Sequence, residues 1–192
     1  MHVVASEHEV LMENLRTAFE NESNTHLCYI EFADKADGEG WHGVASLFRA
    51  VARAEEIHAA NHGRILRQLN AEMHSRPARI EVRCTLENAR TALAAEISEV
   101  DTTYPARLEY ARAARDVASV RTFTWALSAE KAHARLFNEA LALLEIEDED
   151  SWITMPRDFY VCPVCGYTSE YEDRANICPT CFCSRGRFEA IR

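Results

Sequence analysis

Glycine is scarce in the part of the chain where long helices are expected. The sequence has 6 glycines in 192 residues, and none lies between Arg64 and Cys165. A glycine inside a helix costs about 1 kcal/mol relative to alanine, so this stretch favours uninterrupted helices. The chain also lacks any run approaching the roughly 18 consecutive apolar residues of a membrane span. We therefore expect no membrane partner.

Basic residues are outnumbered by acidic ones. The chain has 21 Lys and Arg against 31 Asp and Glu, which gives a formal net charge of −10 at pH 7. Proteins that bind nucleic acid present basic patches to the phosphates, so we expect no nucleic-acid partner. The first residues contain no basic segment followed by an apolar run, and we expect no secretory signal.

Cysteines are few and clustered. Four of the seven form two Cys-x-x-Cys pairs, Cys162 with Cys165 and Cys178 with Cys181. Such spacing is typical of a metal site and not of a disulfide framework, and a reducing cytoplasm is the consistent compartment. Four thiolates bind one tetrahedral ion, either zinc or iron. Cys183 lies just outside the second pair, and we expect it not to be a ligand.

Apolar residues recur at three- and four-residue intervals and predict four long helices. We expect them from about Ser6 to 37, from 42 to 70, from Thr85 onward and from 117 to 145. Ser6 and Thr85 are predicted N-caps, and Pro105 predicts a kink in the third helix. The residues expected to face inward are Leu11, Leu15, Ala18, Phe19 and Leu27 in the first helix, Leu86, Leu93, Ile97 and Val100 in the third, and Phe123, Leu127, Phe137 and Leu141 in the fourth.

The composition changes near residue 150. An acidic run follows the fourth helix and is typical of a solvated linker. After Pro156 the chain becomes rich in Tyr, Cys, Gly and Pro. We therefore predict a helical bundle over 1–147, an acidic linker over 148–156 and a small module over 157–192. A module of about 35 residues cannot bury enough surface to fold unaided, so its metal should supply the folding free energy.

Carboxylate and histidine residues recur in an ordered pattern along the predicted helices. The first half of the chain offers one Glu and then a Glu-x-x-His segment, and the second half repeats this order with an extra Glu. Residues three apart share a helix face, so each Glu-x-x-His segment directs both side chains to one point. This is the known ligand pattern of di-iron and di-manganese carboxylate bundles. It predicts a dinuclear metal site made of Glu22, Glu55, His58, Glu96, Glu99, Glu130 and His133.

The two parts in this order resemble the rubrerythrin family. Its motifs are matched around each predicted ligand segment, in the Tyr104-Pro105 pair and in both cysteine pairs. The resemblance covers nearly the whole chain. It implies a mainly α fold, in which a ferritin-like four-helix bundle is followed by a small rubredoxin-like domain of strands and loops. It also implies two Fe ions in the bundle and one Fe in the four-cysteine site, where Zn is the alternative.

The resemblance also implies roles for individual residues. Glu55 and Glu130 would bridge the two ions, and one iron would be bound by Glu99 when oxidised and by His58 when reduced. Tyr29 and Tyr104 occupy positions whose family tyrosines bond the site carboxylates. Together with Glu99 and His58 they are the predicted catalytic residues. Three positions depart from the usual motif and leave the surroundings of the ligands open: His26, Cys28 and His62.

The predicted function is reduction of hydrogen peroxide to water in oxidative-stress defence. Nothing in the sequence resembles a glycine-rich dinucleotide loop, so electrons should come from a separate NAD(P)H-dependent reductase through the iron of the four-cysteine site. One alternative is an oxidase or ferroxidase that acts with dioxygen. Another is a zinc ribbon that serves as an interaction platform on a structural bundle. The resemblance further implies a head-to-tail homodimer in which the four-cysteine iron of one subunit serves the di-iron site of the other.

Overall fold

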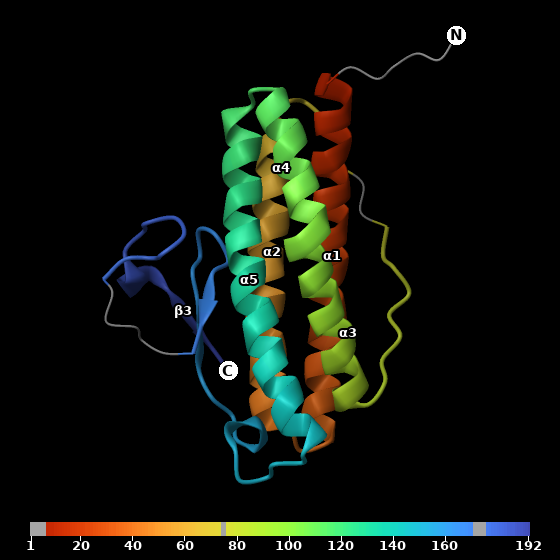
Figure 1. The fold of residues 1–192 in the computed structure, drawn as a ribbon, viewed down its shortest axis with the longest axis vertical. Coiled ribbons are helices and arrows are strands. Elements are labelled where there is room, and N and C mark those ends of the chain that lie inside the picture. Colours follow the sequence, from red (N-terminus) through yellow and green to blue (C-terminus); the bar gives the residue numbers. More distant parts are fainter. Residues whose placement is uncertain (1–6, 74–75, 171–175) are drawn as a thin grey trace.

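The computed structural model describes residues 7–73, 76–170 and 176–192, and Ser6, the first predicted N-cap, lies outside them. Five α-helices form the body of the described part of the chain (Figure 1). Their bounds, with the π-helical turn η1 that joins two of them, are α1 (Glu7–Gly38), α2 (His42–Gln68), α3 (Thr85–Ser98), η1 (Glu99–Thr103), α4 (Tyr104–Ala113) and α5 (Val117–Glu145). None of the described helices is both long enough and apolar enough to cross a membrane.

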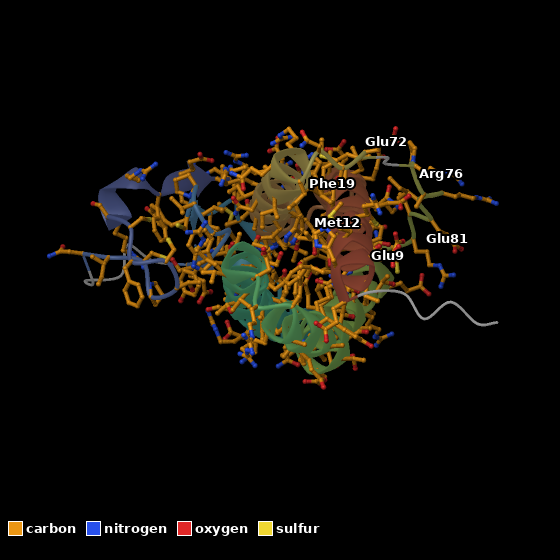
Figure 2. The ribbon with its side chains drawn as sticks, turned by 90° about the horizontal axis from the view of Figure 1, so that it is seen from above. Glu9, Met12, Phe19, Glu72, Arg76 and Glu81 are labelled. Carbon is orange, nitrogen blue, oxygen red and sulfur yellow. The ribbon has the colours of Figure 1, made fainter. Side chains whose placement is uncertain are left out.

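The helices form an antiparallel four-helix bundle in which α3, η1 and α4 make up one column (Figure 1). A crossover leads from the end of α2 to the start of α3, and its described residues 69–73 and 76–84 run along the outside of α1. Figure 2 places its residues Glu72, Arg76 and Glu81 on the outer side of that helix. The Arg76 backbone N–H donates to the Glu20 carboxylate, and the Ala78 N–H donates to Asn24 of α1. The crossover is thus attached to the bundle by its backbone.

The apolar core of the bundle is divided into two clusters. One contains Tyr29, Phe32, Phe48 and Phe137, whose neighbouring rings lie 5.1–6.2 Å apart. The other includes Leu15, Leu66, Tyr104 and Phe123. In every column of the bundle the chain passes from one cluster to the other through a segment that carries a predicted metal ligand. The ligands therefore occupy a layer between two apolar cores.

The inner face of α3 is only partly the one that the sequence predicts. Leu86 and Leu93 are partly buried and pack against the core, as predicted. Ile97 is 46% exposed, and Val100, which lies in η1, is only partly buried. The small residues Ala89 and Ala92 face the core instead, in line with Glu96. Leu27 of α1 is likewise 45% exposed, whereas Phe19, Leu127 and Leu141 are partly buried and pack against the core, as predicted. The prediction was wrong for Ile97 and Leu27, because apolar size does not decide which face turns inward when a helix must lie close to its neighbour and present a ligand.

The predicted kink at Pro105 takes the form of a π-helical turn. Proline lacks an N–H and cannot complete the α-helical pattern with the residue four positions before it. The structure widens the preceding turn, so that the Tyr104 N–H donates to the carbonyl of Glu99, five residues earlier. Such π turns inside α-helices occur often at functional sites. Here the turn joins Glu99 and Tyr104, two of the predicted catalytic residues.

Helix α3 begins one residue away from its predicted N-cap. Cys84 occupies the cap position, and Thr85 is the first helical residue. The hydroxyl and the backbone N–H of Thr85 both donate to the carboxylate of Glu39, at 2.7 and 2.8 Å. A carboxylate from the α1–α2 turn therefore satisfies the backbone N–H of Thr85, one of the N–H groups that the first turn of α3 leaves without a partner in the helix.

The C-terminal part forms a small sheet beside α2 and α5 (Figure 1). Its antiparallel strands β1 (Phe159–Val161), β2 (Thr168–Ser169) and β3 (Glu189–Ile191) are arranged in the order β2-β1-β3, and Tyr160 lies opposite both Ser169 and Ala190. Two short 3-10 turns flank the sheet, η2 (Trp152–Thr154) and η3 (Arg185–Arg187).

Part of the predicted solvated linker is packed against the bundle. Ile153 is fully buried, and the backbone around it lies so close to Gly43 of α2 that a Cβ there would be 2.0 Å from the Trp152 carbonyl oxygen. Glu149 and Asp150 of the segment are exposed, whereas Ile153 is a fixed contact with the bundle. The predicted domain boundaries themselves stay a prediction.

Candidate metal centre

Six of the seven predicted bundle ligands converge in the layer between the two apolar cores. All four columns of the bundle contribute, and none of the six side chains is more than 2% exposed. They are Glu22 from α1, Glu55 and His58 from α2, Glu96 from α3, and Glu130 and His133 from α5.

The six residues form two overlapping groups. In each group the potential ligand atoms lie within 4.8 Å of one another. Glu22 and His58 belong to one group only, and Glu96 and His133 to the other. Glu55 and Glu130 belong to both, which is the arrangement of two carboxylates that bridge a pair of ions. The two groups are Glu22, Glu55, His58 and Glu130, and Glu55, Glu96, Glu130 and His133.

The two histidines present the same nitrogen to the carboxylates. His58 Nδ1 lies 2.9 Å from oxygens of Glu55 and Glu130, and His133 Nδ1 lies 2.8 Å from Glu130. The rings are stacked with centroids 6.0 Å apart. Their Nε2 atoms face outward, where His58 Nε2 donates to the carbonyl oxygen of Cys165 at 3.1 Å. A ring fixed as a donor at Nε2 has its Nδ1 available for a metal ion.

The cysteine module also orients His133. The hydroxyl of Thr168 donates to the Gly166 carbonyl at 3.0 Å, so its oxygen accepts a hydrogen bond from His133 Nε2 at 3.2 Å. Gly166 has φ +79°, and an added Cβ would stand 2.4 Å from His58 Nε2. Asn61 donates to the carbonyl of Val164 at 2.9 Å. Sequence spacing does not reveal these partners, because the knuckle residues lie 35 to 107 residues from the helix residues that they contact.

The site contains buried carboxylate oxygens that lack a hydrogen-bond partner. One oxygen each of Glu22, Glu55, Glu96 and Glu130 makes no hydrogen bond, although that of Glu130 lies 2.9 Å from His58 Nδ1. A buried polar atom without a partner is costly, and a buried charge more so, unless another group compensates it. Divalent cations among these oxygens would supply the compensation. The donor set of carboxylates and imidazoles therefore fits two iron ions.

Without cations, the carboxylates of the layer cannot all be ionised. Burial and the charges of Glu55 and Glu130 raise the pKa of Glu22 well above its usual value, and burial with Glu130 does the same for Glu96. For Glu55 and Glu130, burial is outweighed by the two imidazoles, and their pKa values are lowered. The histidine pKa values are raised in turn, since the carboxylates outweigh burial. Metal binding would displace these protons.

Glu99, the seventh predicted ligand, lies next to the two groups and outside both. It is the first residue of η1. Burial raises its pKa well above the usual value, and the nearby charges of Glu22 and Glu130 add to this. Glu99 thus faces the site from the π-helical turn without joining either group.

Two tyrosines connect the halves of the site. The Tyr29 hydroxyl of α1 donates to Glu96 of α3 at 2.7 Å, and the Tyr104 hydroxyl of α4 donates to Glu22 of α1. Both tyrosines are buried, and burial with the neighbouring carboxylates raises their pKa values well above the usual one. Each tyrosine is therefore held neutral and donates to a carboxylate from the other half of the chain.

The two histidines that the sequence left open have different surroundings. His62 is fully buried and bonds Tyr104 and Thr122, so it is part of the interior around the site. His26 is partly buried, and its Nδ1 lies 2.7 Å from the Ala52 carbonyl. Cys28, the third departure from the motif, lies partly buried at the edge of the core.

The four predicted cysteine ligands form a second cluster. The sulfur atoms of Cys162, Cys165, Cys178 and Cys181 lie within 4.8 Å of one another. Cys183 is adjacent, with its sulfur 3.4 Å from that of Cys162. Gly166 and Phe182 follow the two knuckles with φ +79° and +61°, and their backbone N–H groups donate to Cys162 and Cys178. The side chains thus form a four-thiolate site that fits one iron.

The cysteine cluster belongs to the same chain as the histidines that it contacts. The Cys165 carbonyl, Thr168 and Val164 all meet α2 or α5 of their own bundle. Ser128 of α5 also lies 2.8 Å from Thr180. One chain therefore brings its two metal sites together by itself.

Comparisons with known proteins agree with this architecture. A family model described as Rubrerythrin matches residues 13–141. Rubrerythrin-2 of Clostridium acetobutylicum is 33% identical over 178 residues, which are 92% of this chain and 94% of that protein. Nigerythrin of Nitratidesulfovibrio vulgaris is 32% identical over 181 residues, 93% and 85% of the two chains.

Solved structures show the same fold. A mixed-valence form of nigerythrin superimposes with a TM-score of 0.84 at 28% identity, over 98% of this chain and 88% of the other. The bacterioferritin BfrA of Mycobacterium tuberculosis matches 74% of this chain and 91% of its own, with a TM-score of 0.67 at 17% identity, which supports the bundle fold alone. The predicted fold, a ferritin-like bundle with a small rubredoxin-like domain, is confirmed. With its dinuclear carboxylate–histidine site and its four-cysteine iron site, this chain belongs to the rubrerythrin family.

Proposed function

We propose that this protein reduces hydrogen peroxide to water at a di-iron site, with electrons supplied through the iron of its cysteine module. Membership of the rubrerythrin family supports a di-iron oxidoreductase linked to oxidative stress. The observation that carries the proposal is the hydrogen bond from His58 Nε2 to the Cys165 carbonyl. It joins a predicted ligand of the di-iron site to a predicted ligand of the four-cysteine site.

The bundle ligands in this proposal are the six residues that converge, together with Glu99. Glu55 and Glu130 bridge because each lies in both ligand groups. Glu22 and Glu96 are the terminal carboxylates, and their unpartnered oxygens are available for the ions. Cys162, Cys165, Cys178 and Cys181 hold the third iron.

Two neighbouring iron ions supply two electrons, the number needed to cleave a peroxide O–O bond. The overall change is one H2O2, two electrons and two protons to two waters. The role of the surrounding residues is to fix the positions of the iron ligands. His58 and His133 are fixed by the cysteine module at Nε2, and Tyr29 and Tyr104 donate to the terminal carboxylates. Glu99 and His58, which face the site from opposite sequence halves, are the proposed exchanging ligands.

An electron can pass from one site to the other through few bonds. The route runs from Cys165 through its own carbonyl oxygen, across one 3.1 Å hydrogen bond and into the His58 ring. Because this route lies within one chain, it needs no second subunit. A head-to-tail homodimer and an NAD(P)H-dependent reductase remain parts of the proposal, as does a reducing, cytoplasmic location, with which the seven unpaired cysteines agree.

The test is a comparison of oxidation and turnover in the iron-loaded full chain. The reduced protein is mixed anaerobically with hydrogen peroxide or with dioxygen, and the absorbance of the di-iron site is followed in a stopped-flow instrument. The proposal predicts faster oxidation by peroxide. Faster oxidation by dioxygen would contradict it and would favour the oxidase alternative.

The electron route is tested by removing one thiolate. Cys162→Ser should still oxidise once with peroxide, because the bundle site is intact, but should not turn over with a donor reductase. Cys84→Ser is the matched control, since Cys84 is exposed and lies outside both clusters. Equal turnover of Cys162→Ser and Cys84→Ser would contradict the relay.

A further inference from the structure

A fully buried histidine lies one helical turn beyond a predicted ligand and outside both ligand groups. His62 of α2 has Nδ1 at 3.1 Å from the Thr122 hydroxyl of α5 and Nε2 at 3.2 Å from the Tyr104 hydroxyl of α4. Tyr104 in turn donates to Glu22 of α1. These hydrogen bonds connect all four columns of the bundle in one line, Thr122–His62–Tyr104–Glu22.

The Glu22 carboxylate at the end of this line determines the direction of each hydrogen bond in it. A metal-bound carboxylate of Glu22 can only accept, so the Tyr104 hydroxyl must donate its single proton to Glu22. The Tyr104 oxygen is then an acceptor for His62 Nε2, which must carry a proton. In a neutral ring Nδ1 is left as an acceptor, and Thr122 must donate to it.

The surroundings of His62 keep its ring neutral. Burial lowers the pKa of His62 well below its usual value. The charges of His58 on α2 and Arg107 on α4 lower it further, and Glu130 on α5 opposes them. Arg107 also lies over the Tyr104 ring, with its guanidinium carbon 5.1 Å from the centroid. No carboxylate bonds His62 among the described residues.

Thr122 is the end of the line that meets the surface. It lines a small pocket of about 40 Å³ between α2 and α5, together with Asn61, Arg64 and Gln68. A water molecule needs roughly 10–15 Å³ of such space. Water in the pocket can donate to the Thr122 oxygen while the Thr122 proton points inward to His62.

We propose that His62 is a positioning residue of the metal centre: anchored by Thr122, it occupies the acceptor side of the Tyr104 oxygen and so directs the Tyr104 proton to Glu22. A hydrogen bond to a ligand carboxylate draws electron density away from the metal and favours the ferrous state. Without His62 the Tyr104 hydroxyl is free to rotate. The inference rests on the proposed function only in taking Glu22 as an iron ligand.

The first measurement needs no reaction with oxygen species. In the protein loaded with zinc, which is diamagnetic, nitrogen-15 NMR of the histidine rings should show His62 neutral and protonated at Nε2 between about pH 6 and 8. Thr122→Val, which removes the hydroxyl at nearly constant volume, should weaken this preference, and Thr122→Ser should retain it. A wild-type His62 protonated at Nδ1, or doubly protonated, would overturn the proposal.

The second measurement is the reduction potential of the iron-loaded bundle site. His62→Leu and Thr122→Val should both lower it, and Thr122→Ser should leave it at the wild-type value. Thr122→Val keeps the test decisive should His62→Leu fail to fold. Unchanged potentials in the variants that fold and bind two irons would overturn the positioning role.

The two measurements on His62 can fail independently of the test of the proposed peroxide reduction. A protein that does not reduce peroxide but shows the expected tautomer and potential shifts would contradict the proposed reaction alone. A protein that reduces peroxide with potentials insensitive to His62 and Thr122 would contradict the positioning role alone.

Discussion

At the scale of single residues, Gly166 is the point where the two metal sites touch. Its positive φ, and the 2.4 Å that would separate an added Cβ from His58 Nε2, leave no space for a side chain. Gly166→Ala should therefore push the knuckle away from His58, break the hydrogen bond between His58 Nε2 and the Cys165 carbonyl, and slow electron transfer from the iron of the four-cysteine site to the di-iron site. Stopped-flow reduction of the oxidised bundle site by a donor reductase measures this rate.

Gly186 provides the control for this prediction. It lies in η3, where an added Cβ would meet only the Ser184 hydroxyl oxygen, at 3.7 Å. Gly186→Ala should transfer electrons at the wild-type rate. If Gly166→Ala matched Gly186→Ala, the contact at His58 would have no part in the route.

The residues of the candidate site were predictable because their chemistry repeats with helical spacing. In each Glu-x-x-His segment the two residues lie on the same helix face, and two Cys-x-x-Cys pairs are typical of a site for one metal ion. These residues could therefore be proposed as ligands from the sequence. His62 was not assignable, since its role depends on Tyr104 and Thr122 of other helices. Ile97 was misplaced because Glu96, a polar residue, decides which face of α3 turns inward.

At the scale of elements, α5 is fixed at its start by an N-cap. The Asp116 carboxylate accepts a hydrogen bond from the Ser119 backbone N–H at 2.7 Å. Asp116→Ala should lower the free energy of unfolding by about 1 kcal/mol, and Asp116→Ser should recover most of the loss. Denaturant unfolding of the metal-loaded chains measures this. If both variants lost the same free energy of unfolding, Asp116 would not stabilise the protein by capping α5.

The α1–α2 hairpin contains a carboxylate whose protonation should affect stability. Burial raises the pKa of Asp37, but hydrogen bonds from His42 and Arg49 of α2 outweigh it, and the pKa is lowered. A lowered folded-state pKa gives stability that is present above the unfolded value of about 3.9 and lost as the pH falls through the folded value.

Asp37→Asn should therefore be less stable than the wild type at about pH 6, and the difference should shrink towards about pH 2. Urea unfolding at a series of pH values gives the difference directly, because other acid-sensitive groups are common to both chains. A difference that stays constant across this range would contradict the role of Asp37.

The helix bounds were predicted well, and the interruptions less well. Helix α5 was predicted from its apolar period and found over 117–145, and the Asp116 cap, which was not predicted, fixes its start. The effect of Pro105 was predicted as a kink and found as a π turn, because the chain can widen a turn and keep its hydrogen bonds. The sequence predicts that the helix is interrupted at Pro105, but the packing of the bundle determines whether the interruption is a kink or a π turn.

At the scale of the whole molecule, the two modules differ in what holds them together. The bundle has two apolar clusters, whereas the cysteine module has a three-stranded sheet of eight residues around its sulfur atoms. Removing the metals with a chelator should therefore unfold the module and leave most bundle helicity. Limited proteolysis should then cut after about residue 157, with circular dichroism nearly unchanged. A protease-resistant module after metal removal would contradict this dependence on metal.

The chain brings its own cysteine module against its own bundle, a relation that sequence spacing could not supply. The predicted linker packs through Ile153, and Arg53 of α2 bonds Glu189 of β3 at 2.7 and 3.0 Å. These contacts fix where the module lies. The position of the four-cysteine site next to His58 is thus a property of the whole fold.

The central claim is that two overlapping groups of side chains hold a pair of iron ions inside the bundle. Anomalous diffraction at the iron absorption edge, from crystals of the iron-loaded chain, tests it most directly. The account predicts three peaks per chain, two of them about 3.5–4 Å apart between Glu55 and Glu130 and the third among the four cysteines. A single peak in the bundle, or none, would contradict it.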